Sequence, residues 1–223
     1  LNLSMIHHIL ITHDHADHIK SVGSISDSFN IPVYSTQAVH EGIAKNWCVK
    51  KKVSPNQVRY VEKGKTQQIG DFTVTPFAVP HDSSDCVGYC VQCEGITFTL
   101  VTDCGHVTEE ICAFVAKANY LVIEANHEVE KLMAGPYPLY LKERITSQIG
   151  HLSNAECART IVENATENLK HVWLCHLSDE NNHPELARIA VTSLMESYGL
   201  RAGVDFIVEV LRRKIPSEIY DLK

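Results

Sequence analysis

The chain has 223 residues, of which 44% are hydrophobic, so it can bury one sizeable core, and nothing in it is of low complexity. Its formal net charge of −7 argues against a broad electrostatic surface for nucleic acid. No signal peptide and no apolar run of membrane length is visible, so we expect a protein of the reducing cytoplasm with no membrane partner.

Apolar runs of strand length alternate with stretches of helical periodicity along the chain. The expected strands are Ile6–Thr12, Ile31–Ser35, Phe72–Pro80, Val87–Glu94, Ile96–Thr102, Tyr120–Glu124, His171–Cys175 and Asp205–Leu211. The expected helices cover Ala16–Ser28, Thr36–Lys45 and Thr108–Lys117, and two more begin after the capping-box residue Ser153 and at Pro184. The segment Lys131–Ile149 is expected to be a loop. This pattern predicts a mixed α/β protein with helices over its sheets.

The most informative stretch is HDHADH, residues 13–18, directly after the first expected strand. Because His13 and His15 are two residues apart on extended backbone, they project to the same side. Asp17 and His18 follow as the chain turns into a helix, so their side chains reach a second, adjacent position. Three imidazoles and one carboxylate form a donor set suited to zinc, manganese or iron. The alternative is a chance cluster.

The pattern HxHxDH after a buried strand resembles the metallo-β-lactamase superfamily. This resemblance implies a four-layer αββα sandwich and three further metal ligands, each placed where an apolar strand ends. The matching residues here are His81, Asp103 and His176. The resemblance assigns the seven ligands to two divalent metals: His13, His15 and His81 hold one, Asp17, His18 and His176 hold the other, and Asp103 bridges them. A water bound there would supply a metal-bridging hydroxide, which Asp17 would orient or deprotonate.

Two further motifs resemble the YycJ (WalJ) branch of that superfamily, which is related to its tRNA-processing and exonucleolytic members. They are LVIEANH, residues 121–127, and GHLSN, residues 150–154. In the related nucleases a Glu and a His outside the metal shell act on the phosphate, and Glu124 and His151 match them. The resemblance implies that His151 binds the scissile phosphate or protonates the leaving oxygen, while Glu124 fixes its tautomer. The alternatives are a backbone-bonded histidine and a buried structural acceptor.

One departure from the superfamily concerns the front of the chain. The superfamily normally places several strands before the HxHxDH pattern, whereas the pattern begins here at residue 13. We therefore expect a single domain over residues 1–223 whose first sheet lacks its N-terminal strands.

The eight cysteines are expected to be free thiols, several of them buried. Cys90 and Cys93 have the spacing of a metal or redox pair, but they lie within an alternating strand and no second pair accompanies them.

The substrate is less well indicated than the site. Four lysines (Lys45, Lys50, Lys51 and Lys52) surround Trp47, and Lys142 and Arg144 precede His151. Such patches contact a phosphate backbone and stack a base in some proteins, and are solvated faces in others.

Three functions follow as hypotheses. The first is a metal-dependent phosphodiesterase, an exonuclease acting on DNA or RNA. The second is a hydrolase of a small ester, thioester or cyclic phosphate. The third is a non-catalytic module that keeps the metals for stability and binds a partner. Zinc is the expected metal, with manganese and iron as alternatives.

Overall fold

The computed structural model describes residues 5–223 and contains two compact units. Of these residues, 5–78 and 82–89 form the first unit, and 79–81 and 90–223 form the second. The strand β6 (Val87–Cys93) contributes residues to both. Within residues 5–223, no helix has the length and apolar character that crossing a membrane requires.

The first unit contains a small parallel sheet with the strand order β1-β2-β3. Its elements are β1 (Ile9–Leu10), α1 (Ala16–Ile19), α2 (Val22–Phe29), β2 (Val33–Ser35), α3 (Gln37–Lys45), the 3-10 turn η2 (Pro55–Gln57), β3 (Val58–Tyr60) and the antiparallel hairpin of β4 (Gln67–Ile69) and β5 (Phe72–Ala78). Buried aliphatic side chains from the helices and strands fill its core, among them Ile19, Val33 and Ile43. This core fixes the position of the loop that follows β1.

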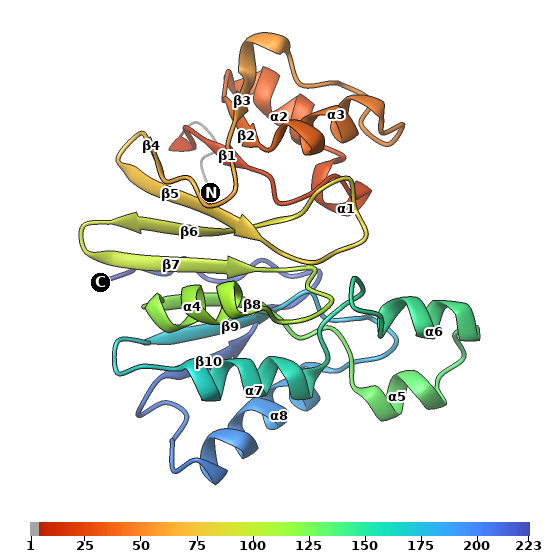
Figure 1. Ribbon diagram of the computed structural model, residues 1–223, viewed down its shortest axis with the longest axis vertical. Helices are drawn as coiled ribbons and strands as arrows, with labels where there is room; N and C mark the ends of the chain where they lie inside the picture. The colour runs from red at the N-terminus through yellow and green to blue at the C-terminus, as the bar shows by residue number, and fades with distance from the viewer. Residues whose placement is uncertain (1–4) are drawn as a thin grey trace. The chain divides into compact units, whose positions relative to one another are not determined.

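The second unit is built on four parallel strands in the order β10-β9-β8-β7. Its elements are β7 (Ile96–Val101), α4 (Glu109–Lys117), β8 (Tyr120–Glu124), α5 (Val129–Ala134), α6 (Leu139–Ile145), α7 (Asn154–Asn164), β9 (His171–Cys175), α8 (Pro184–Ser197) and β10 (Ile207–Val210). Figure 1 shows α4 and α7 in front of the strands. Because the strands are parallel, the carboxyl ends of β7, β8 and β9 meet at one edge of the sheet.

Most expected elements are confirmed, and the differences have local causes. The strands β8 and β9 have the expected bounds, and Ser153 forms the expected capping box with Glu156. The strand expected over Ile6–Thr12 pairs only at Ile9–Leu10, because β2 offers a short partner. The expected helix Ala16–Ser28 is divided into α1 and α2.

The expectation of a loop over Lys131–Ile149 was wrong, because this segment contains most of α5 and all of α6. These helices have six and seven residues, and several of their apolar side chains are exposed: Met133, Leu139 and Tyr140. They therefore lack the periodic buried face by which a helix is detected in a sequence. The eight cysteines are thiols outside any disulfide, and Cys86, Cys90, Cys104 and Cys157 are buried, as expected.

Candidate metal centre

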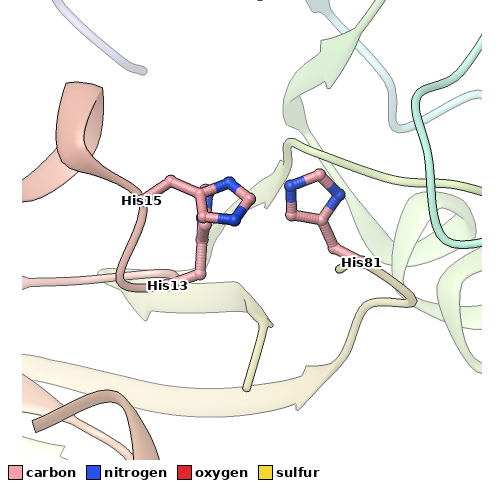
Figure 2. Close-up of side chains that lie close together, drawn as sticks. All are labelled: His13, His15 and His81. Atoms are coloured by element: carbon pink, nitrogen blue, oxygen red, sulfur yellow. The ribbon is translucent and has the colours of Figure 1, made fainter. Parts of the chain in front are cut away.

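In the first unit, the loop after β1 and the helix α1 together gather the three histidines of the HDHADH stretch. The ring of His13 is fully buried, and its centroid lies 4.8 Å from that of His15 and 4.3 Å from that of His18. Figure 2 draws His13 and His15 on this loop, together with His81 of the second unit. The carboxylate of Asp17 lies 3.7 Å from Nε2 of His18. The expected grouping of His13, His15, Asp17 and His18 is therefore present within this unit.

Asp14, the remaining acid of the stretch, has a structural role. Its carboxylate accepts hydrogen bonds from the backbone N–H and hydroxyl of Ser84, and its carbonyl accepts one from Asn46. The ring nitrogen Nε2 of His15 lies 3.1 Å from the carbonyl oxygen of Asp82. These bonds fix the loop and direct Asp14 away from the imidazoles.

In the second unit, Asp103 and His176 follow β7 and β9 with an unusual backbone. Both have a φ of +54°, in the left-handed region that non-glycine residues rarely adopt. Strained backbone of this kind persists where the surrounding structure imposes it, and it is common at functional sites. The two turns bring Oδ1 of Asp103 to 3.4 Å from Nε2 of His176.

Glu124, at the end of β8, is a fully buried carboxylate with four hydrogen-bond donors around it. Its Oε1 accepts from Nδ1 of His151 at 2.8 Å and from Nδ1 of His176 at 2.7 Å. Its Oε2 accepts from the backbone N–H groups of Cys104 and Leu152, at 2.8 and 3.1 Å. The carboxylate thus holds both histidine rings by the nitrogen that carries a proton, and each Nε2 faces away from it.

The hydrogen bonds of Glu124 also set the charge states of Glu124 and His151. Burial alone would raise the pKa of Glu124, but the hydrogen bonds and charges of His151 and His176 hold that pKa well below its usual range. Burial would lower the pKa of His151, yet the bond to Glu124 raises it above the ordinary value. The structure therefore favours an ionised Glu124 beside a histidine that readily takes a second proton.

His81 and His151 are positioned by the turn before α7. Nδ1 of His81 bonds to the carbonyl oxygen of Gly150, which leaves Nε2 at 3.6 Å from Oδ1 of Asp103. Gly150 passes so close to α6 that a Cβ there would lie 2.2 Å from the carbonyl oxygen of Ile145. Only glycine fits this approach, and the turn orients His151 toward Glu124.

Sequence reasoning missed two contacts of this site. It assigned Glu124 to His151 alone, whereas the carboxylate also holds His176. It also passed over Asn126, whose side chain donates to the carbonyl oxygen of His176 at 2.9 Å. The carbonyl of Asn126 in turn accepts from the backbone N–H of Ser178. In a sequence, an asparagine beside a strand end looks the same whether it holds a neighbouring loop or is hydrated at the surface, so no signal could have identified Asn126.

The donor types fit divalent metal ions in both units. Asp103, Glu124, His151 and His176 each offer an atom within 4.8 Å of the others. Because both oxygens of Glu124 are already bonded, we interpret Asp103 and His176 as the ligand-type residues of this group. Imidazole and carboxylate donors suit zinc, manganese and iron alike.

A family model described as a beta-lactamase superfamily domain matches residues 1–176. The chain belongs to the β-lactamase superfamily. It is 33% identical over 223 residues to a Bacillus anthracis protein named exodeoxyribonuclease YycJ, across 98% of this chain and 82% of that protein. It is 36% identical over 200 residues to a Streptococcus pneumoniae serotype 2 protein named exodeoxyribonuclease WalJ, across 90% and 74% of the two chains. The resemblance to the YycJ (WalJ) branch is confirmed.

The solved structure of a metallo-β-lactamase fold protein, YhfI from Bacillus subtilis, matches this chain with a TM-score of 0.69 at 16% identity, across 95% of this chain and 77% of that one. The expected metallo-β-lactamase fold, an αββα sandwich, is confirmed. Membership of this superfamily of metallo-hydrolases implies divalent metal ions. The expectation of a single domain over residues 1–223 stays a prediction.

Proposed function

We propose that this chain is a metal-dependent phosphodiesterase that removes nucleotides from the ends of DNA. The observation that carries the proposal is the Glu124–His151 hydrogen bond, because it places a proton-carrying imidazole among the candidate metal ligands. Two relatives named exodeoxyribonucleases, at 33% and 36% identity, support DNA as the polymer.

The proposed ligand sets are those of the sequence pattern. They are His13, His15 and His81 for one metal, and Asp17, His18 and His176 for the other, with Asp103 shared. Divalent metals bound by these residues would activate water for attack and neutralise charge on the phosphate. Zinc is the proposed metal, with manganese or iron as alternatives that share these ligands.

His151 is proposed to bind the scissile phosphate and to protonate the leaving oxygen. Glu124 holds the proton on Nδ1, so the second proton of an imidazolium is carried by Nε2 and is available to an oxygen of the substrate. The side chain of His151 is 17% exposed, which leaves it accessible. A histidine bonded only to backbone would lack this carboxylate partner.

Asp17 is proposed to orient the attacking water and to take its proton. Its side chain is 69% exposed and lies next to His18, so one carboxylate oxygen can face a ligand while the other faces water. Glu124 cannot serve as this base, because its buried carboxylate already accepts four hydrogen bonds.

The test is the shortening of end-labelled DNA by protein loaded with manganese or zinc. We expect stepwise loss of nucleotides from single-stranded DNA by the wild type, and none by the ligand variant Asp103→Asn. Bis(p-nitrophenyl) phosphate and a thioester are the comparison substrates. Hydrolysis of the thioester without cleavage of either phosphodiester would contradict the proposal and favour the small-ester hydrolase. Inertness toward all three by metal-loaded protein would favour the non-catalytic module.

A further inference from the structure

The two oxygens of the Asp103 carboxylate have different neighbours in the second unit. Oδ1 lies 3.6 Å from Nε2 of His81 and 3.4 Å from Nε2 of His176. Oδ2 accepts a hydrogen bond of 2.8 Å from the hydroxyl of Thr102, the residue directly after β7. Both residues are buried, since Asp103 is 2% exposed and Thr102 is 7% exposed. One oxygen of the carboxylate thus has a buried hydroxyl donor, and the other faces two histidines.

The two histidines beside Oδ1 belong to different proposed ligand sets. His81 is a proposed ligand of one metal, and His176 is a proposed ligand of the other. A carboxylate can bind metals through one oxygen or through both. Because Oδ1 lies close to a ligand atom of each set, it is the oxygen of Asp103 that is suited to contact both metals.

The orientation of an aspartate carboxylate is soft unless a partner fixes it, because the torsion that turns its plane has a broad minimum. The left-handed φ of Asp103 and the bond from the N–H of Cys104 to Glu124 fix the backbone where the side chain begins. They do not fix how the carboxylate is turned. The hydroxyl of Thr102 does so, since turning the plane would break its bond to Oδ2. The threonine side chain is itself stiff, because it is β-branched.

Thr99 shows what an ordinary buried threonine does in the same strand. It is fully buried in β7, and its hydroxyl donates to the carbonyl oxygen of Phe114 in α4 at 3.2 Å. That bond satisfies a backbone acceptor and involves no proposed metal ligand. Thr102 carries the same side chain three residues later, but its hydroxyl donates to a carboxylate that is a proposed ligand. The two residues therefore provide a comparison between a structural hydroxyl and one that acts on the site.

We propose that Thr102 is a positioning residue of the candidate metal centre, whose hydroxyl holds Oδ2 of Asp103 so that Oδ1 alone bridges the two metals. Hydrogen-bonding partners of metal ligands orient the ligand, and their loss costs about 10- to 100-fold in metal affinity or activity. The inference rests on the proposed function, which assigns Asp103 as the shared ligand.

Manganese provides a readout of the bridge that does not require catalysis. The metals of a two-metal site lie about 3.5–4 Å apart. Two manganese ions at such a separation are magnetically coupled through an oxygen that they share. Electron paramagnetic resonance of the manganese-loaded wild type should therefore show a coupled pair, and titration calorimetry measures the affinity of the same protein for manganese.

The variants at Thr102 separate the hydroxyl from the shape of the side chain. Thr102→Val keeps the β-branched shape and removes the hydroxyl, so we expect about 10- to 100-fold weaker manganese binding and weaker coupling between the ions. Thr102→Ser keeps the hydroxyl and should retain the affinity and the coupling of the wild type. Thr102→Ala removes the hydroxyl without adding a methyl group, and it should behave as Thr102→Val does.

The matched control is Thr99→Val, which removes a buried hydroxyl bond from the same strand. Urea unfolding of the metal-free proteins checks that each variant is folded, and Thr99→Val should then bind a coupled manganese pair as the wild type does. Wild-type affinity and coupling in both Thr102→Val and Thr102→Ala would overturn the inference. So would an equal loss of affinity in Thr99→Val or in Thr102→Ser, or an uncoupled pair in the wild type. Failure of the proposed function is distinguishable, because a wild type with a coupled manganese pair would then hydrolyse no phosphodiester.

Discussion

Nδ1 of His176 lies 2.7 Å from Oε1 of Glu124. The same oxygen accepts a second hydrogen bond from His151, so one buried carboxylate orients a proposed metal ligand and a proposed phosphate-binding residue together. Partners that hold metal-binding histidines by their second nitrogen fix the ring and raise the basicity of the ligand atom. Metal binding and phosphate contact should therefore both depend on Glu124.

Glu124→Gln is expected to lower both activity and stability. All four groups around the carboxylate are donors, so the amide NH2 of glutamine faces two of them. If the NH2 group takes the place of Oε1, it donates to Nδ1 of His176, and that nitrogen must accept. The ring proton then moves to Nε2, which is the atom needed to bind metal. We expect a loss of about 10- to 100-fold in metal affinity or activity. The free energy of unfolding should fall by about 2 kcal/mol.

Metal titration and urea unfolding measure these two effects. The matched control is Glu185→Gln, because Glu185 is exposed and pairs with the exposed Arg188 at the start of α8. Wild-type metal affinity in Glu124→Gln would show that the carboxylate is only a structural acceptor.

Asp103→Asn is expected to fold normally and to lose metal. Asn tolerates the left-handed region at least as well as Asp, so the turn at φ +54° is retained. The amide lacks the negative charge that a shared ligand provides. Asp103→Val should in addition be destabilised, by about 1–3 kcal/mol, because a β-branched residue is strained at positive φ. Metal content and thermal unfolding of the two variants separate the ligand role from the backbone role.

The candidate metal ligands came from the resemblance to the superfamily, which could be applied because strand ends are recognisable in a sequence. Asp103 and His176 follow recognisable buried strands, Glu124 is the last residue of another, and parallel pairing brings those ends together. The bond from Glu124 to His176 was not predictable, because it depends on the register that pairs Glu124 with Cys175 and on the left-handed turn at His176. Strand register and turn conformation are settled by packing across the whole sheet.

Histidine burial was also difficult to predict. His40 is buried, and its Nε2 bonds to the carbonyl oxygen of Arg59. His171 is also buried, and its ring stacks on Trp173 with centroids 4.0 Å apart. His183, by contrast, is exposed and caps α8. A lone histidine carries no periodicity, so the sequence does not distinguish these environments.

Ser153→Ala is expected to lower the free energy of unfolding by about 1 kcal/mol. The hydroxyl of Ser153 caps α7 by accepting from the backbone N–H of Glu156, and the Glu156 carboxylate in turn accepts from the backbone N–H of Ser153. Urea unfolding measures the change, with Ser197→Ala at the exposed end of α8 as the control. An equal effect in the two variants would contradict the capping role.

The stability of the fold should fall as the pH drops below the ordinary histidine pKa, in part through His40. Burial lowers the pKa of His40, against a smaller opposite effect of the backbone hydrogen bond to Arg59. The stabilisation that comes from neutral His40 is therefore complete above about pH 6.5. It is lost as the pH falls toward the lowered pKa of the folded protein, because His40 of the unfolded chain is protonated first.

His40→Gln should make the melting temperature less dependent on pH between about pH 7 and 5. An NMR titration of the histidine Cε1–H signals measures the pKa directly. A His40 pKa at or above the ordinary value would contradict this assignment. Burial also lowers the pKa of His127 and His171, so part of the pH dependence should remain.

The most direct test of the account measures metal content and DNA cleavage in the same sample of His151→Ala. His151 is assigned to the phosphate and not to the metals, so the variant should bind as much metal as the wild type. Its cleavage of end-labelled single-stranded DNA should fall by about 10²- to 10⁴-fold, the contribution of a positioned general acid. Loss of metal from the variant, or wild-type cleavage by it, would contradict the account.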